Sequence, residues 1–152
     1  MKKKILLTIL LIAVVLITGC TAKEKLEPSN FKKIMEKKGF IVTDQTGIAL
    51  AEIGNVELSY KAETSDQRYT IYFYEFDGEV SAQGFYAKKQ AVFGATGSQV
   101  YTELNLGNYS KYTIIYHDTF AAISRVSNTA IYVETEKIYQ EEVKQLLLDI
   151  GY

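Results

Sequence analysis

The chain of 152 residues has no tryptophan and only one cysteine, one histidine and one proline. A single cysteine cannot form a disulfide within the chain, so the fold must be stabilised by side-chain packing. A zinc site normally needs three or four Cys, His or carboxylate ligands, and this composition supplies few of them. The absence of tryptophan also weighs against a sugar-binding platform built on indole rings. These shortages exclude a disulfide scaffold and give little support to metal chemistry.

The first twenty residues differ in composition from the rest. Lysines at positions 2–4 are followed by an apolar run over residues 5–17, then by Thr18, Gly19 and Cys20. A basic start, an apolar middle and small residues at the end are typical of an export signal. As a helix, the apolar run would be about 20 Å long, short of the ~30 Å hydrocarbon core of a bilayer. It is therefore a weak candidate for a retained transmembrane anchor.

The sequence Ile17-Thr18-Gly19-Cys20 resembles the lipobox of bacterial prolipoproteins. In that family the cysteine thiol is joined to diacylglycerol, the signal is removed, and the cysteine becomes the first residue of the mature protein. The resemblance implies cleavage between Gly19 and Cys20, lipidation of Cys20 and a place on the extracytoplasmic face of the cell membrane. Acyl chains contribute about 0.8 kcal/mol per buried CH₂, and two chains give stable anchoring.

An ordinary secretory signal with an incidental cysteine, or a buried structural thiol, is the alternative interpretation of Cys20. Neither explains why the only cysteine falls at the end of the apolar run. With Cys20 acylated, no free thiol remains, which excludes thiol catalysis and cysteine metal sites. We expect residues 1–19 to be a signal peptide, residues 20–27 a lipidated polar tether, and residues 28–152 one domain.

Charge is unevenly distributed in the expected mature chain. Removing residues 1–19 takes away three lysines and no acid, leaving 14 basic and 18 acidic residues and a formal charge of −4. This mildly acidic balance argues against a nucleic-acid partner. Residues 21–40 carry six lysines and three glutamates, whereas residues 41–152 carry eight bases and fifteen acids. The basic part either meets anionic lipid headgroups or is the solvated face of a short helix.

Apolar periodicity predicts an α+β domain. Helices are expected at residues 28–39, from Asp77 to about Phe93, and from Thr135 or Glu136 to Ile150. Strands are expected at residues 40–43, 48–53, 56–62 and 69–76. From residue 99 the period changes to two, with breaks at residues 107–108, 117–118 and 127–128. Short turns between strand-like runs imply antiparallel hairpins. The predicted fold is an antiparallel sheet with a C-terminal four-strand meander, packed by about three helices.

No motif for catalysis, metal or cofactor stands out, and we assign no catalytic, metal or cofactor residues. His117 precedes Asp118, but neighbours on a strand point to opposite faces, and aspartate suits a turn. The stretch from Asp77 to Glu79 lacks the alternating oxygen ligands of a calcium loop. The segment from Gly94 to Gly97 follows a helix and lacks the lysine of a phosphate-binding loop. Both segments are interpreted as structural.

Twelve tyrosines are the most unusual feature of the composition. They could form a binding surface, because tyrosine gives a large contact area at low entropy cost. The favoured alternative is that tyrosine simply suits half-buried strands. Nine fall on or beside predicted strands: Tyr60, Tyr69, Tyr72, Tyr74, Tyr101, Tyr109, Tyr112, Tyr116 and Tyr132.

These features favour a lipid-anchored, extracytoplasmic, non-enzymatic domain that binds a protein or cell-wall partner or supports an envelope assembly. Its signal and its C-terminal stretch RVSNTAIYVETEKIYQEEVKQLLLDIGY resemble small uncharacterised surface lipoproteins of Gram-positive bacteria. A small-ligand carrier with a pocket between helix and sheet is one alternative. Another is a cell-wall hydrolase that uses two carboxylates about 5–9.5 Å apart. Its candidate carboxylates are Glu52, Glu57, Glu75, Glu103 and Glu134.

Overall fold

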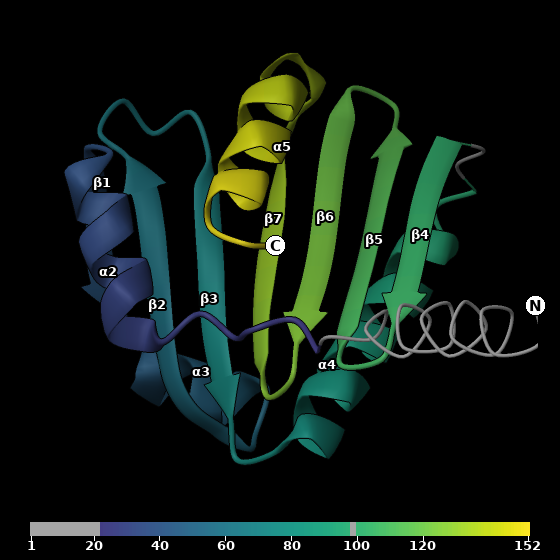
Figure 1. The fold of residues 1–152 in the computed structure, drawn as a ribbon. Helices are drawn as coiled ribbons and strands as arrows, with labels where there is room; N and C mark the ends of the chain where they lie inside the picture. The colour runs from purple at the N-terminus through teal and green to yellow at the C-terminus, as the bar shows by residue number, and fades with distance from the viewer. Residues whose placement is uncertain (1–21, 98–99) are drawn as a thin grey trace, which may run out of the picture.

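A computed structural model describes residues 22–97 and 100–152, so the expected cleavage and lipidation site at Gly19 and Cys20 lies outside the described residues. Its seven strands form one sheet in the order β1-β2-β3-β7-β6-β5-β4, and every neighbouring pair is antiparallel (Figure 1). The elements in chain order are α2 (Pro28–Lys37), β1 (Phe40–Asp44), α3 (Thr46–Glu52), β2 (Val56–Thr64), β3 (Thr70–Phe76), α4 (Glu79–Gly94), β4 (Val100–Leu106), β5 (Tyr109–Tyr116), β6 (Thr119–Val126), β7 (Thr129–Glu136), the 3₁₀ turn η1 (Lys137–Tyr139) and α5 (Gln140–Asp149).

The α+β class and the antiparallel sheet predicted from the sequence are confirmed. Strands β4 to β7 follow one another in both chain and sheet order, joined by two-residue turns. The first residue of each turn has a positive φ: 56° at Gly107, 50° at His117 and 51° at Ser127. Such left-handed turn residues match the right-handed twist of the paired strands.

Helices cover both faces of the sheet. Helices α2 and α5 lie on one face, and α3 and α4 lie on the other (Figure 1). The central strands require this cover because they alternate large side chains onto both faces. On β3, for example, Ile71 and Phe73 belong to the core under α2 and α5, whereas Tyr74 and Phe76 belong to the core under α4. The core therefore consists of two clusters separated by the sheet.

The strand predicted at residues 48–53 is wrong, because this segment lies in helix α3 and the turn that follows it. The Asp44 carboxylate accepts a hydrogen bond from the Thr46 backbone N–H at 2.8 Å, which ends β1 and begins the helix. The helix has seven residues and buries only Ala49. A single buried position leaves too little periodicity to distinguish a short helix from a strand.

The predicted start of the last helix is also wrong. Strand β7 continues to Glu136, where it pairs with Thr119 of β6. The next backbone N–H, of Lys137, donates to the Asp118 carbonyl at 2.7 Å. Pairing with β6 satisfies backbone groups that a helix beginning at residue 135 would withdraw from the sheet, so α5 begins at Gln140.

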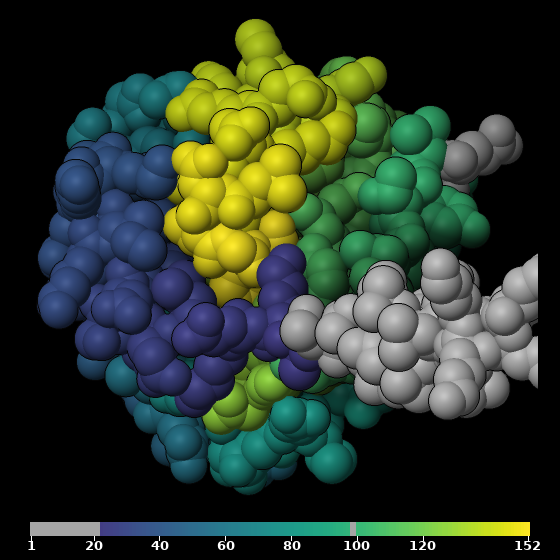
Figure 2. All heavy atoms as spheres, viewed as in Figure 1, coloured from purple at the N-terminus to yellow at the C-terminus, as the bar shows by residue number. Residues whose placement is uncertain are grey.

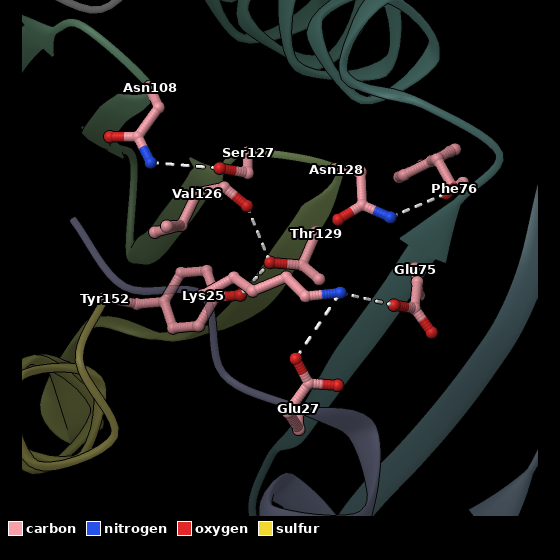
Figure 3. Close-up of polar contacts among 10 residues, drawn as sticks. All are labelled: Lys25, Glu27, Glu75, Phe76, Asn108, Val126, Ser127, Asn128, Thr129 and Tyr152. Carbon is pink, nitrogen blue, oxygen red and sulfur yellow. Dashed lines mark hydrogen bonds and ion pairs between the residues drawn. The ribbon is translucent and has the colours of Figure 1, made fainter. Parts of the chain in front are cut away.

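The two ends of the described chain meet on the α2/α5 face, where Figure 2 shows the N-terminal segment (purple) beside the C-terminal helix (yellow). Residues 23–27, predicted as a polar tether, contact the sheet there. The Lys25 ammonium lies 3.0 Å from Glu75 and 3.5 Å from Glu27 (Figure 3). The buried Tyr152 hydroxyl lies 2.5 Å from Thr129 Oγ1. These contacts hold both ends of the described chain against the sheet.

Candidate functional site

A groove of about 550 Å³ lies on the α3/α4 face. It lies between α4 and the turn that follows α3, with β3 as its floor. The aromatic rings of Tyr74, Phe76 and Phe85 line it. The other lining residues are Glu52, Ile53, Gly54, Asn55, Val80, Ser81, Gly84, Lys88, Lys89 and Val92. Its volume falls in the range of small-molecule sites.

The aromatic floor follows from strand alternation. Tyr72, Tyr74 and Phe76 occupy every second position of β3 and so face the same side of the sheet. The Phe85 ring from α4 lies 4.9 Å from the Tyr74 ring and 5.4 Å from the Phe76 ring, between centroids. Burial raises the pKa of Tyr74, which keeps its hydroxyl neutral at physiological pH. The floor is therefore a rigid, uncharged aromatic surface.

Charged groups stand at the wall of the groove. Lys88 and Lys89 come from α4, and Glu52 comes from the end of α3. The Lys89 ammonium lies 4.1 Å from the centroid of the Tyr132 ring, a cation–π geometry. Burial lowers the pKa of Lys89. Because Glu52 is the only carboxylate among the described lining residues, the α4 side of the groove is basic.

A tyrosine and carboxylate cluster continues from the groove along the sheet. The hydroxyls of Tyr116 and Tyr132 both donate hydrogen bonds to Glu134, the latter at 2.6 Å. The Tyr72 and Tyr132 rings are 6.1 Å apart. Burial, followed by the hydrogen bond to Glu134, raises the pKa of Tyr116 to about 12 and also raises that of Tyr132. Both hydroxyls stay protonated donors at neutral pH.

The tyrosines named from the sequence divide between the two faces. Tyr60, Tyr69 and Tyr109 contribute to the core under α2 and α5. The remaining six lie on the α3/α4 side of their strands, as strand alternation requires: Tyr72, Tyr74, Tyr101, Tyr112, Tyr116 and Tyr132. Of these six only Tyr101 is mostly exposed. Most of these rings therefore pack in the half-buried manner that the favoured interpretation expects, and one of them lines the groove.

The five candidate carboxylates do not converge on one hollow. Glu52 lines the groove, whereas Glu75 lies on the opposite face and pairs with Lys25. Glu134 is held by two tyrosines. Glu103 accepts a hydrogen bond from Asn105 at 2.7 Å. Glu57, the fifth, is exposed at an irregularity in the pairing of β2 with β3.

His117 is exposed in the turn between β5 and β6, with its ring 6.4 Å from the Tyr116 ring. Its position agrees with the structural role of this turn. Among residues 22–97 and 100–152, no three His, Cys, Asp or Glu side chains are placed to hold a metal ion. None of the helices in these ranges is long and apolar enough to cross a membrane.

Sequence reasoning missed Lys88, Lys89 and Gly84 as lining residues of the groove. The spacing of residues 81, 84, 85, 88 and 92 at three or four positions could have marked one face of a helix. This spacing could not have shown that a groove lies beside this face, because the segment that forms α3 is predicted as a strand.

No protein-family model matches the chain, and no curated protein sequence matches it. Among solved structures, the chain is similar to a GTP-binding regulator from Thermotoga maritima, with a TM-score of 0.51 and 17% sequence identity. The alignment covers 83% of this chain and 87% of the other. At this identity the likeness shows a shared fold alone.

Proposed function

We propose that this chain is a lipid-anchored, extracytoplasmic protein that binds a small ligand in the groove between α3 and α4. The groove of about 550 Å³, with its aromatic floor and basic wall, is the observation that carries the proposal. Aromatic rings bind the apolar body of a ligand, and a few polar groups at the edge select its charge. Lys88 and Lys89 favour a ligand with an acidic group.

The contacts of Lys23 indicate which part of the domain would lie near the proposed anchor at Cys20. The Lys23 backbone N–H donates to the Asn108 side chain at 2.9 Å, and the Lys23 ammonium lies 3.6 Å from the centroid of the Tyr109 ring. Residues 20 and 23 are three positions apart in the chain, so their Cα atoms are separated by at most about 11 Å. An acyl group on Cys20 would therefore hold the β4–β5 side of the α2/α5 face close to the bilayer.

This side of the sheet has the composition of a surface that meets lipid. Leu104 and Leu106 of β4 are 42% and 62% exposed, and they pair with Lys111 and Tyr109 of β5. Lys23 and Lys111 add positive charge beside these leucines. Exposed apolar side chains flanked by lysines bind the interface of an anionic bilayer. In this orientation the groove, on the other face of the sheet, opens away from the membrane.

The arrangement favours binding over the carboxylate-dependent hydrolysis considered above. Such hydrolysis needs two carboxylates across one cleft. The groove presents one carboxylate among its described residues, and Glu75 lies on the opposite face of the sheet. A protein or cell-wall partner is compatible with the same groove, provided that it inserts a side group of similar size.

The anchor is tested by replacing Cys20 with alanine in cells and fractionating them. We expect the wild-type protein to be cleaved and membrane-bound, and the Cys20→Ala protein to be uncleaved and free of acyl label. A Cys20→Ala protein that is still cleaved and labelled would contradict lipidation. Thr21→Ala, next to the cleavage site, serves as the matched control and should leave processing unchanged.

The groove is tested by filling it. Gly84 lies in the middle of α4, and a Cβ at this position meets nothing within 4 Å. Leucine there enters the groove, and it also favours the helix because glycine costs about 1 kcal/mol in a helix interior. Gly84→Leu should therefore remain folded while the groove is blocked. Ala91→Leu, on an exposed part of the same helix, is the control.

The measurement is native mass spectrometry of the protein extracted from its host membrane in mild detergent. We expect a bound small molecule, in addition to the acyl anchor, on the wild type and on Ala91→Leu but not on Gly84→Leu. Equal occupancy in all three proteins, or an empty wild type, would count against the groove as the binding site.

A further inference from the structure

A second cavity, of about 350 Å³, lies on the other side of α4 from the groove. One wall consists of α4 side chains spaced three or four residues apart, and the other consists of strand residues. Its lining residues are Gln83, Tyr86, Ala87, Gln90, Asn105, Gly107, Ser110 and Arg125. Its polar side chains are three amides, two hydroxyls and one guanidinium, each of which can donate a hydrogen bond, and none of them is acidic.

Arg125 lies at the base of this cavity with 6% of its surface exposed. One terminal nitrogen of its guanidinium, Nη1, donates to the Ser127 carbonyl at 3.1 Å, and Nη2 donates to Ser110 Oγ at 3.4 Å. The Nε–H has no acceptor in the described part of the chain. None of the ion pairs formed between described residues includes Arg125.

Strand register explains how a cation comes to be buried here. Arg125 of β6 pairs with Ser110 of β5, and Ser110 pairs with Asn105 of β4, so the three form one row across the sheet. Arg125 alternates with Ile123 and Ala121, which both belong to the core under α4. Burial of a charge without a counterion is costly, so proteins keep such a charge mainly where something pairs with it.

Tyr86 supplies a second unsatisfied donor in the same cavity. Its side chain comes from α4 with 5% exposed, and its hydroxyl has no hydrogen-bond partner among residues 22–97 and 100–152. Burial is the main cause that raises its pKa to about 12, so the hydroxyl is protonated at neutral pH. The hydroxyl of Tyr86 and the Nε–H of Arg125, on opposite walls, thus both lack an acceptor in the described residues.

We propose that this cavity binds a monocarboxylate, either a small molecule or the carboxylate end of a longer one, with Arg125 and Tyr86 as its principal donors. A carboxylate has two acceptor oxygens in a plane, so it can accept from the guanidinium Nε–H on one wall and from the hydroxyl on the other. The amides of Gln83 and Gln90 line the same cavity and complete a donor set without further charge.

The charge around the cavity favours a single negative charge over a dianion such as phosphate. Arg125 is its only cationic lining residue among those described. The Glu103 carboxylate, held by Asn105 at 2.7 Å, acts on Tyr86 in the direction that raises its pKa, so negative charge already lies nearby. A second charge on the ligand would be repelled. This site shares no lining residue with the groove, so its test does not depend on the ligand proposed there.

The chain contains only two arginines, Arg68 and Arg125, which makes a direct test possible. The test is an NMR titration of the full-length protein in detergent with sodium acetate, following the two arginine Nε–Hε signals. Sodium chloride and sodium phosphate at equal ionic strength are the reference titrations. We expect acetate to shift the Arg125 signal in a saturable manner and to leave the Arg68 signal unchanged.

Two variants establish which groups bind. We expect acetate to raise the melting temperature of the wild-type protein, and Arg125→Met should abolish this rise. Tyr86→Phe should weaken acetate binding about tenfold while the protein stays folded. Arg68→Met removes the exposed arginine that pairs with Asp66 and Glu142, and it should leave acetate binding unchanged. If Arg125→Met does not fold, the acetate affinities of Tyr86→Phe and wild type still test the proposal.

Several results would overturn the proposal. These are equal shifts of the Arg125 signal by chloride and acetate, saturable binding of phosphate but not acetate, or acetate affinity in Tyr86→Phe equal to that of wild type. An Arg125 signal that does not respond to acetate would also overturn it.

Discussion

The two faces of the sheet differ in how their buried polar groups are paired. On the α2/α5 face, both ends of the described chain pack against the strands, and the buried Tyr152 hydroxyl has a partner at 2.5 Å. On the α3/α4 face, two cavities flank α4, and a further hollow of about 390 Å³ lies on the α2/α5 face between Phe40 and α5. Three of the four buried side-chain polar atoms without a partner in the described residues lie on the α3/α4 face, on Ser59, Tyr86 and Arg125. The fourth, on Thr135, is the exception. The α3/α4 face therefore holds more of the buried polar groups that lack a partner, and it is the face for which we propose binding.

Deletion of one phenyl ring on each face should give the largest effect. Phe73 is fully buried and stacks on Phe31 at 4.7 Å, whereas Phe85 borders the open groove. Phe→Ala changes cost about 3–5 kcal/mol, and the cost rises with the volume of empty cavity left behind. We expect Phe73→Ala to lose about 5 kcal/mol and Phe85→Ala about 3 kcal/mol in urea unfolding. Equal losses would contradict the expected difference between the two rings.

Removal of one hydroxyl from each face makes a sharper comparison. Thr129 Oγ1 donates to the Val126 carbonyl at 2.8 Å and therefore accepts from the Tyr152 hydroxyl. Loss of a buried hydrogen bond costs about 1–2 kcal/mol. Tyr152→Phe should lose this amount, whereas Tyr86→Phe should be neutral or slightly more stable because its hydroxyl has no described partner. Denaturant midpoints of the two variants and wild type check this, and a similar loss in both would contradict it.

Alkaline titration tests the buried tyrosines of the α3/α4 face. The pKa values of Tyr86 and Tyr116, both on the α3/α4 face, are raised from 10.0 to about 12. A raised pKa in the folded state stabilises the protein below the unfolded pKa, and this contribution is lost as pH rises toward the folded pKa. The free energy of unfolding should therefore fall between about pH 10 and 12.

The measurement is the phenolate absorbance of folded and urea-unfolded protein over this range. Tyr116→Phe should remove part of the difference between the two titration curves. Identical folded and unfolded curves would contradict the prediction.

Much of the fold could be predicted because its signals are local. Pro28 begins α2, and Gly39, with φ of 87°, follows its end. The three two-residue turns after residue 106 lie where the sequence predicts them, because strand periodicity changes at each one. Helix α3 could not be predicted, because a short apolar segment near Ala49 fits a helix and a strand equally well.

The candidate sites could be predicted only in part. The tyrosines could be predicted from the sequence as a possible surface. The groove could not, because it forms only when α3 and α4 lie on the same face of the sheet. Arg125 of β6 is not among the residues predicted from the sequence, although its alternation with Ala121 and Ile123 indicates that a charge lies on a buried face. Lipidation at Cys20 rests on the sequence and stays a prediction.

The sequence by itself determined the turns, the antiparallel hairpins and the expectation of an anchor at Cys20, because each depends on residues adjacent in the chain. Tertiary structure decided which face each helix covers, and thereby which polar groups were left without partners. Burial of Arg125 and Tyr86 in one cavity depends on the register of β4, β5 and β6 and on the position of α4 above them. Such contacts between distant residues are set by packing of the whole domain, and no local pattern carries them.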